Sequence, residues 1–538
     1  MRESKFAAIY NVTSNAKANL YEGKRKVESS YTDVGTVNVT GGQLSDIYGA
    51  AKVTATDAVL GDVTEYGSRY SSECTAQGPT IYSAGGTNFI DEDKAVLLSS
   101  YLTSQTIAVG QATLTRTTAQ ELYNIANVKL NDAAVKRAEA VNEVVTETYD
   151  YKNGKLDHKR TSVSDVTGTL TATDATFTDT GAAVAKYATV TLTDCNFTGN
   201  GRIVGGRGET VSSGSVSGYT NYGDARTALS DDTTTTNTVA GKLTATRSTL
   251  GAIWSYAAVN LTDCTTLTID NYGDTGKSTL TLAGDNVINA TTVYSIRNVT
   301  DVTVKDGSTT LNKGYSGEEA DNIITVNAKA ELIAKGTVSF GSGNDTLTVN
   351  GAFRAAAGFD YNELEKLSGS GLLALTTVTC KNVLDAIKNG SIKKSGNLEI
   401  VAAGDYEKDV LAVRTRKEEL ADNTAKGARK HYSGTTNGWL SAVEAPDVGK
   451  FADTQDWVSF KYEGGDYKVT LTDNTRYADL TVELYDGKGD TKLATATWNS
   501  TQKRFNLTGM AVGTDYQVHL AIKDGKRAMS YALTSPMG

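Results

Sequence analysis

A three-residue unit recurs along the chain, an apolar residue followed by a polar one and then by a second apolar one. In the most regular stretch, the first residues of successive units are 22, 22 and 23 positions apart. These units are Leu280-Thr281-Leu282, Val302-Thr303-Val304, Ile324-Thr325-Val326 and Leu347-Thr348-Val349. Because side chains alternate between the faces of a strand, both apolar residues point to one side. The near-constant step predicts coils of a parallel β-helix, each adding one strand in register.

Similar units occur upstream with looser spacing, and the segment VTGTLTATDATF at residue 166 returns as VAGKLTATRSTL at residue 239. A row of β-sandwich domains would also alternate, but sandwiches usually show tight hairpin signals such as Asn-Gly between strands. Residues 166–351 show few such signals. We therefore predict an all-β chain built on a right-handed parallel β-helix, a β-solenoid, over residues 36–375. Residues 1–35 are expected to form an N-terminal segment or cap.

Three further stretches depart from this pattern. Residues 118–147 carry apolar residues in an approximately helical rhythm after a capping-box signature, which predicts a helical insertion in the solenoid. Residues 376–445 combine short helical patterns with charged stretches, which predicts a mixed helical connection. Residues 446–538 contain period-two strands separated by turn clusters, which predicts a small antiparallel β-sandwich.

Composition and charge support this prediction and exclude some partners. The chain has 52 Gly and only 3 Pro, which suits many short strands and argues against a disordered linker. Its 62 acidic and 53 basic residues are interspersed, so no basic stripe is available for nucleic acid. No apolar run approaches the ~18 residues of a transmembrane segment. Cys195 and Cys264 occupy equivalent places in two repeats, where stacked inward side chains are favoured over a disulfide.

No motif of a common hydrolase is present, since the three histidines form no H-E-x-x-H pattern and no G-x-S-x-G elbow occurs. Some parallel β-helices cleave polysaccharides with carboxylates and a basic residue on one face. The matching candidates here are Asp231, Asp232, Asp263 and Asp270, with Arg247 nearby in the sequence. They lie in turns and Thr-rich segments, where aspartate is favoured for local hydrogen bonding. We therefore expect a chain that is not an enzyme, and a secreted polysaccharide lyase or hydrolase is the alternative.

The C-terminal segment resembles the bacterial pre-peptidase C-terminal (PPC) domain. The resemblance rests on "DTQDWVSF" with Asp453, Asp456, Trp457 and Phe460, on "ADLTVELYDGKG" and on "VGTDYQVHL". It covers less than a fifth of the chain. Because such domains are non-catalytic modules of secreted proteins, the resemblance implies secretion and not peptidase activity.

A second segment, "SFGSGNDTLTVNGAF", resembles one turn of RTX-type repeat proteins and of very large bacterial adhesins. In those families, the Asp and the backbone of a glycine-rich nonapeptide bind calcium between successive turns. The matching residues here would be Gly341, Gly343, Asn344 and Asp345. The adjacent turns do not match, so we favour a solvated corner, with calcium as the alternative.

These patterns together predict an extracellular structural or adhesive protein of the cell surface. A long, stiff solenoid would present one face to surface glycans, to other proteins or to copies of itself. The alternatives are the secreted polysaccharide-cleaving enzyme and a self-assembling subunit of a surface layer or filament, because uncapped solenoid ends template further stacking.

Overall fold

The chain folds almost entirely into β-strands in the computed structural model, and it divides into two units, Met1–Val302 and Thr303–Gly538. The all-β prediction is confirmed, and large parallel sheets account for many of the strands. The structure describes the chain except for residues 1–8, 11, 22–23, 78–80, 85–86, 91–95, 153–154, 218–231, 356, 376–381, 384–385, 388, 397, 403–419, 432–433, 443–451, 527–528 and 537–538.

The apolar-polar-apolar units of the first unit form one parallel sheet. Its strands, in their order across the sheet, are β4 (Thr36–Thr40), β7 (Lys52–Thr56), β14 (Val109–Thr115), β16 (Ile125–Asn131), β20 (Thr167–Thr173), β23 (Tyr187–Thr193), β28 (Lys242–Thr246), β30 (Ala258–Thr262) and β34 (Thr279–Ala283). Leu170 pairs with Val190, and Val190 pairs with Leu243. All three side chains are fully buried. The prediction that each unit adds a strand in register is confirmed for these strands.

A second parallel sheet of the first unit alternates with the first along the chain. It contains β6 (Ile47–Tyr48), β9 (Val63–Thr64), β15 (Thr118–Tyr123), β17 (Ala134–Glu139), β22 (Ala182–Ala185), β25 (Arg202–Val204), β29 (Ile253–Trp254), β32 (Ile269–Asp270) and β36 (Tyr294–Arg297). One residue with a left-handed backbone turns the chain after most strands of the first sheet, with φ between 45° and 54°. These residues are Asp57, Arg116, Asp132, Asp174, Asp194, Arg247 and Asp263. Aspartate tolerates this conformation, which explains why it recurs at the corner.

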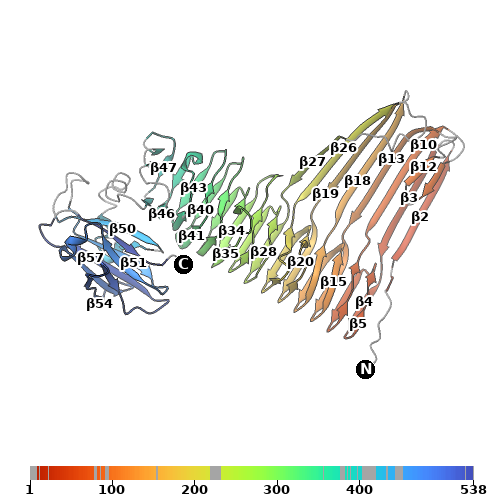
Figure 1. Ribbon diagram of the computed structural model, residues 1–538. Helices are drawn as coiled ribbons and strands as arrows, with labels where there is room; N and C mark the ends of the chain where they lie inside the picture. The colour runs from red at the N-terminus through yellow and green to blue at the C-terminus, as the bar shows by residue number, and fades with distance from the viewer. Residues whose placement is uncertain are drawn as a thin grey trace. The chain divides into compact units, whose positions relative to one another are not determined.

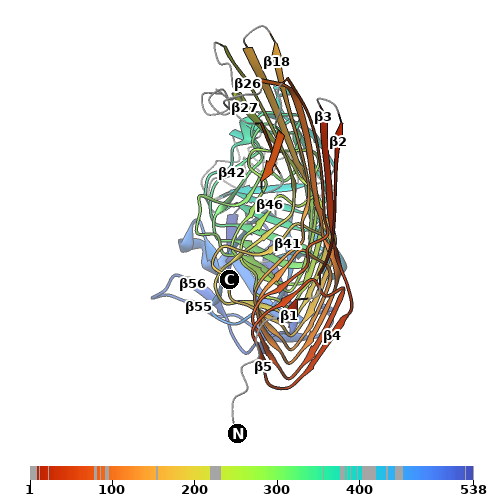
Figure 2. The same cartoon turned by 90° about the vertical axis from the view of Figure 1, so that its right-hand side faces the viewer.

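A nine-stranded sheet of much longer strands extends from the parallel strands of the first unit, as Figure 1 and Figure 2 show. Its order is β2 (Val12–Tyr21), β3 (Lys24–Asp33), β10 (Ser68–Gln77), β13 (Val96–Ile107), β18 (Asn142–Lys152), β19 (Lys155–Ser164), β26 (Arg207–Ser217), β27 (Asp232–Thr238) and β33 (Asp274–Thr275). Neighbours from β2 to β27 are antiparallel. The chain therefore makes long hairpin excursions between short parallel strands. The segment 1–35, predicted as a cap, supplies β2 and β3.

The predicted helical insertion at residues 118–147 is wrong. These residues form β15, β16, β17 and the start of β18. Val128 and Leu130 lie in β16 with buried side chains, and Leu130 pairs with Leu114 of β14. The same apolar residues satisfy a period of two as well as a helical period over short stretches. Pairing with neighbouring strands decided between the two periods, because tertiary contacts override weak local preference.

Parallel strands also build the first half of the second unit, in two groups. One group is β40 (Ile323–Val326), β43 (Thr346–Val349), β45 (Lys366–Ser368) and β47 (Lys393–Ser395). The other is β38 (Gly307–Leu311), β41 (Ala330–Ala334), β44 (Ala352–Ala355), β46 (Leu372–Leu375) and β48 (Glu399–Ala402). The strands β47 and β48 fall inside the segment 376–445 that was predicted as a mixed helical connection. The described helical residues of that segment are few, and they include two short 3-10 turns at Leu420–Asp422 and Ala425–Gly427.

Two five-stranded sheets form the C-terminal part of the second unit. One contains β49 (Arg429–Lys430), β51 (Gln455–Lys461), β57 (Asp515–Ile522), β53 (Leu480–Asp486) and β54 (Lys492–Thr495). The other contains β50 (Thr435–Leu440), β58 (Met529–Thr534), β52 (Tyr467–Leu471), β56 (Arg504–Leu507) and β55 (Trp498–Asn499). Both contribute to one buried apolar cluster, in which Val458 and Val518 come from the first sheet and Val469 and Leu533 from the second. These sheets begin at β49, earlier than the predicted boundary at residue 446.

Candidate functional site at the base of the antiparallel sheet

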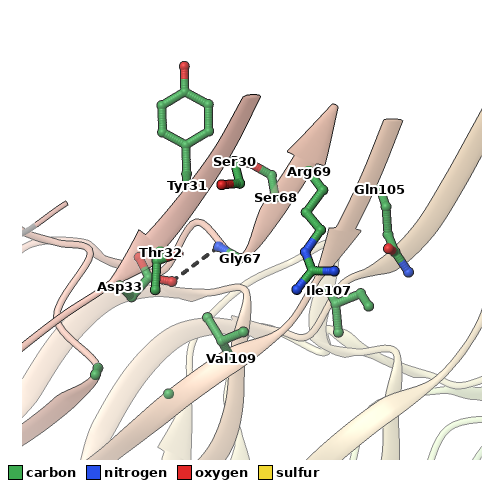
Figure 3. A pocket seen from close by; sticks show the side chains of 12 residues that line it. Ser30, Tyr31, Thr32, Asp33, Gly67, Ser68, Arg69, Gln105, Ile107 and Val109 are labelled. Atoms are coloured by element: carbon green, nitrogen blue, oxygen red, sulfur yellow. Dashed lines mark hydrogen bonds between the residues drawn. The ribbon is translucent and has the colours of Figure 1, made fainter. Parts of the chain in front are cut away.

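A pocket of about 620 Å³ lies in the first unit, where β3, β10 and β13 of the long antiparallel sheet approach the parallel strands. Figure 3 shows its lining. Arg69 of β10 pairs with Ser30 of β3 on one side and with Gln105 of β13 on the other. Directly paired residues of neighbouring strands point to the same face of a sheet. Ile107 and Val109 add an apolar surface to the same pocket.

Asp33 fixes the backbone at the edge of this pocket. Its two carboxylate oxygens each accept a hydrogen bond from the backbone N–H of Tyr66 at 3.0 Å, and Oδ2 accepts a third from Gly67 at 3.1 Å. Gly67 has a φ of 43°, and a Cβ there would lie 2.2 Å from the backbone oxygen of Ile107. The last residue of β3 therefore holds the turn through which the chain leaves β9 and enters β10.

Glu65 lies directly behind the pocket wall. Only 1% of its surface is exposed, and its carboxyl oxygens meet no hydrogen-bond donor among the described residues. A Cβ on the pocket residue Gly110 would lie 3.2 Å from its Cδ. Burial, and secondly the neighbouring Asp33 carboxylate, raise the pKa of Glu65 to about 9. Glu65 is therefore protonated at neutral pH.

Replacing Glu65 by glutamine is expected to change how stability depends on pH. The ordinary pKa of 4.5 is raised to about 9 in the folded chain, so the stability from Glu65 is complete below about pH 4.5 and is lost as the pH rises to 9. The slope is roughly 1.4 kcal/mol per pH unit. Glu65→Gln keeps the shape of the side chain and has no proton to lose, so urea unfolding at pH 5, 7 and 9 should show a flatter profile.

The control for this experiment is Glu121→Gln. Glu121 is a partly exposed glutamate of the adjacent β15, and its Oε1 is 3.9 Å from the Lys136 Nζ. This variant is expected to keep the wild-type slope. Equal slopes for wild type and Glu65→Gln between pH 5 and 9 would show that Glu65 is ionised in the folded chain.

The pair formed by Asp33 and Glu65 is not arranged for acid–base catalysis. Glycosidases hold two carboxyl groups about 5–10 Å apart on either side of the scissile bond. Here Asp33 is occupied by backbone N–H groups, and Glu65 is almost completely buried. The pair therefore supports the junction between the two kinds of sheet.

The carboxylates considered from the sequence for polysaccharide cleavage take part in structural ion pairs and turns. Arg247 binds Asp194 at 2.7 Å, and both lie in the row of left-handed corners with Asp263. Asp263 also accepts a hydrogen bond from the backbone N–H of Asp285 at 2.9 Å. Asp270 binds Arg297 at 2.6 Å, away from this row. Asp232 begins β27, and Asp231 lies outside the described residues.

The glycine-rich loop predicted for calcium lies before β43. Asp345 is completely buried, and its Oδ1 accepts hydrogen bonds from the backbone N–H of Asn322 at 2.7 Å and from its side-chain amide at 3.2 Å. Its Oδ2 meets no donor among the described residues. Burial, as the largest effect, raises the pKa of Asp345. Asp345 therefore leaves one buried oxygen available to a cation.

The rest of this loop supplies hydrogen-bond donors instead of further ligands. Gly341 and Asn344 donate their backbone N–H groups to carboxylates of neighbouring turns at 2.9 Å. At Gly343, a Cβ would lie 2.6 Å from a backbone oxygen of the adjacent turn. Calcium takes six to eight oxygen ligands, and the described residues contain no group of three or more His, Cys, Asp or Glu that could hold a metal. These residues do not fit a calcium shell, which favours the solvated corner over the calcium alternative.

Cys195 and Cys264 are buried and free. The backbone N–H of Cys195 donates a hydrogen bond to the hydroxyl of Ser248. Ser248 follows β28 at the position that Cys195 has after β23 and Cys264 has after β30, so it lies between the two cysteines. Burial raises the pKa of both thiols. They are stacked inward side chains, as the repeat pattern predicted.

The residues quoted for the PPC resemblance form the centre of the C-terminal sheets. Asp453 and Asp456 are buried, and Asp456 accepts a hydrogen bond from the Tyr531 hydroxyl at 2.6 Å. Burial, followed by the charges of Asp422 and Asp453, raises the pKa of Asp456 well above its usual range. The Arg429 guanidinium lowers that pKa, and its Nε is 4.0 Å from Asp422. One guanidinium thus acts on two buried carboxyl groups, those of Asp422 and Asp456.

Sequence reasoning missed the pocket because it missed the long hairpins around it. A signal for one other hairpin of the same sheet was present in Asn153-Gly154, because Lys152 of β18 pairs with Lys155 of β19. Among the described residues, no helix is both long enough and apolar enough to span a membrane. Comparison with known proteins found no matching family model, no matching curated protein and no matching solved structure.

Proposed function

We propose that the chain is an extracellular structural or adhesive surface protein whose parallel strands wind into a right-handed β-helix. The in-register ladder of parallel strands, with a left-handed residue after most strands of the first sheet, carries the proposal. Each added strand buries two apolar side chains and repeats the same outward face. A scaffold of this kind provides a long, stiff binding surface.

The outward face of the first parallel sheet suits contact with hydroxylated partners. Thr171 pairs with Thr191, and Thr191 pairs with Thr244, so their side chains form one row. Two residues further on, Thr193 pairs with Thr246 in a second row. Neighbouring strands are about 4.8 Å apart, so the rows repeat at that spacing. Each hydroxyl can donate and accept a hydrogen bond, as the hydroxyls of a glycan can.

Retention on glycan surfaces tests the proposal. The purified full chain is incubated with immobilised neutral and acidic polysaccharides, and both bound protein and released sugar are measured. The expected result is retention without release of soluble fragments. Release of oligosaccharides would support the alternative of a polysaccharide lyase or hydrolase, and no retention on any glycan would overturn the adhesive role.

The calcium prediction is tested on the same preparation. A ligand that binds only the folded chain raises its melting temperature by mass action. The loop at Asp345 offers one free carboxylate oxygen, so we expect the melting temperature to be the same with and without a chelator. A clear decrease with chelator would show a cation site, and Asp345→Asn would then be expected to remove the effect.

A further inference from the structure

We propose that the pocket beside Arg69 binds an acidic saccharide, with Arg69 holding a sugar carboxylate. This inference rests on the proposed adhesive function and specifies the ligand. The neighbouring Gln105 and Ser30 would contact sugar hydroxyls, and Ile107 and Val109 would face the C–H surface of the ring. All five residues line the same pocket.

Arg69 has no carboxylate partner among the residues that the structure describes, unlike four other arginines of the first unit. Arg116 binds Asp57, Arg160 binds Glu147, Arg247 binds Asp194 and Arg297 binds Asp270. Arg69 makes no ion pair or hydrogen bond through its side chain with any residue that the structure describes. An exposed guanidinium in a pocket therefore keeps its donors for a ligand. Arginine is the side chain best suited to bind a carboxylate with two parallel hydrogen bonds.

The Asp33 carboxylate of the same pocket does not neutralise Arg69. Asp33 is three residues beyond Ser30 in β3, so its side chain belongs to the opposite face of the sheet from Ser30 and Arg69. Its oxygens are already bonded to the backbone N–H groups of Tyr66 and Gly67. Figure 3 shows the bond between Asp33 and Gly67 beside Thr32, and Arg69 and Gln105 on the next strands. Among the lining residues, Arg69 is therefore the one charged side chain on its face of the sheet.

The rest of the lining favours a sugar over a small inorganic anion. The Gln105 side-chain amide can donate and accept hydrogen bonds, and so can the hydroxyls of Ser30 and Thr32. The hydroxyl groups of a sugar ring can likewise donate and accept. Ile107 is 36% exposed, and with Val109 it forms an apolar surface that an inorganic anion would leave uncovered. The volume of about 620 Å³ lies within the usual range for small-ligand pockets, roughly 300–1,000 Å³. A sugar with a carboxylate on a pyranose ring can contact all three kinds of lining: the charged Arg69, the polar side chains and the apolar surface.

The test compares oligogalacturonate, a chain of acidic hexoses, with its methyl ester and with a neutral galactose oligomer. Calorimetric titration of the full-length wild type is expected to show binding of the acidic oligomer only. Arg69→Gln is expected to weaken that binding about tenfold or more, since a bidentate charged hydrogen-bond pair is lost. Arg69→Lys should retain part of it. Addition of inorganic phosphate at equal concentration should not compete.

The matched control is Arg160→Gln, which removes the same charge from β19 of the same sheet, outside the pocket. It is expected to bind like the wild type, and circular dichroism should show both variants folded. The pocket assignment would be overturned if Arg69→Gln bound as tightly as the wild type, or if acidic and neutral oligomers bound equally. Retention on glycan surfaces would in either case leave the adhesive role intact. Binding of an acidic peptide with the same dependence on Arg69 would overturn the saccharide class.

Discussion

Replacing Arg429 by leucine is expected to destabilise the C-terminal sheets by about 3–5 kcal/mol, because a buried ionic group that loses its partner is left uncompensated. The Arg429 side chain is only 7% exposed, and its charge acts on the carboxyl groups of Asp422 and Asp456. Leucine fills part of the space but supplies no charge and no donor for the backbone oxygen of Asn437, which now accepts from Arg429 at 3.0 Å. Urea unfolding followed by tryptophan fluorescence would measure the loss.

The pH dependence of this variant provides a second measurement. Burial and neighbouring carboxyl groups already raise the pKa of Asp456 in the wild type. In the variant, the loss of stability comes from ionised carboxyl groups that no longer have the Arg429 charge beside them. A carboxyl group with a raised pKa stabilises the fold at low pH, where it is neutral, and this stability is lost as the pH rises. The Arg429 variant should therefore be nearly as stable as the wild type at about pH 4 and differ from it most at about pH 8.

The control is Arg476→Leu. Arg476 is 26% exposed and pairs with Asp479 at 3.2 Å, so the cost should stay below about 1 kcal/mol. Equal losses for both variants would contradict the role assigned to Arg429.

Replacing Leu192 by aspartate is expected to disrupt the parallel strands of the first unit. Leu192 of β23 is 1% exposed and pairs with Ala172 of β20 and Ala245 of β28, which are also buried. An aspartate there places an unpaired charge in an apolar row and should cost at least about 4 kcal/mol. Limited proteolysis and urea unfolding would show the loss of structure.

The adjacent residue provides the control. Thr191 lies in the same strand and pairs with Thr171 and Thr244, but its side chain points to the outward face. Thr191→Asp adds the same charge one position away and should cost less than about 1 kcal/mol. Similar losses for the two variants would contradict the assignment of inward and outward faces.

The strand units of this chain could be predicted from sequence because their signal is local and repeated. Leu280-Thr281-Leu282 and its equivalents show the period of two within three residues, and their step indicates one strand per repeat. Aspartate at the corner is equally local, because its short polar side chain tolerates the left-handed backbone at Asp194 and Asp263. The inward positions of Cys195 and Cys264 followed from the same register.

The long antiparallel sheet and the pocket could not be predicted from these signals. Residues 118–147 fit a helical period and a strand period almost equally, and only pairing with neighbouring strands decided between them. The strands around Arg69 alternate without a strong apolar face, so their sequence does not indicate which segments pair.

The contacts of the pocket join residues far apart in the chain. Arg69 and Gln105 are 36 positions apart and become neighbours only through the pairing of β10 with β13. The protonation of Glu65 likewise depends on burial and on Asp33, which lies 32 positions earlier. The sequence by itself determined the all-β class, the repeat and the inward face, because these depend on neighbouring residues. Only the tertiary structure decided the hairpin sheet and the candidate binding site, because these depend on pairing between distant strands.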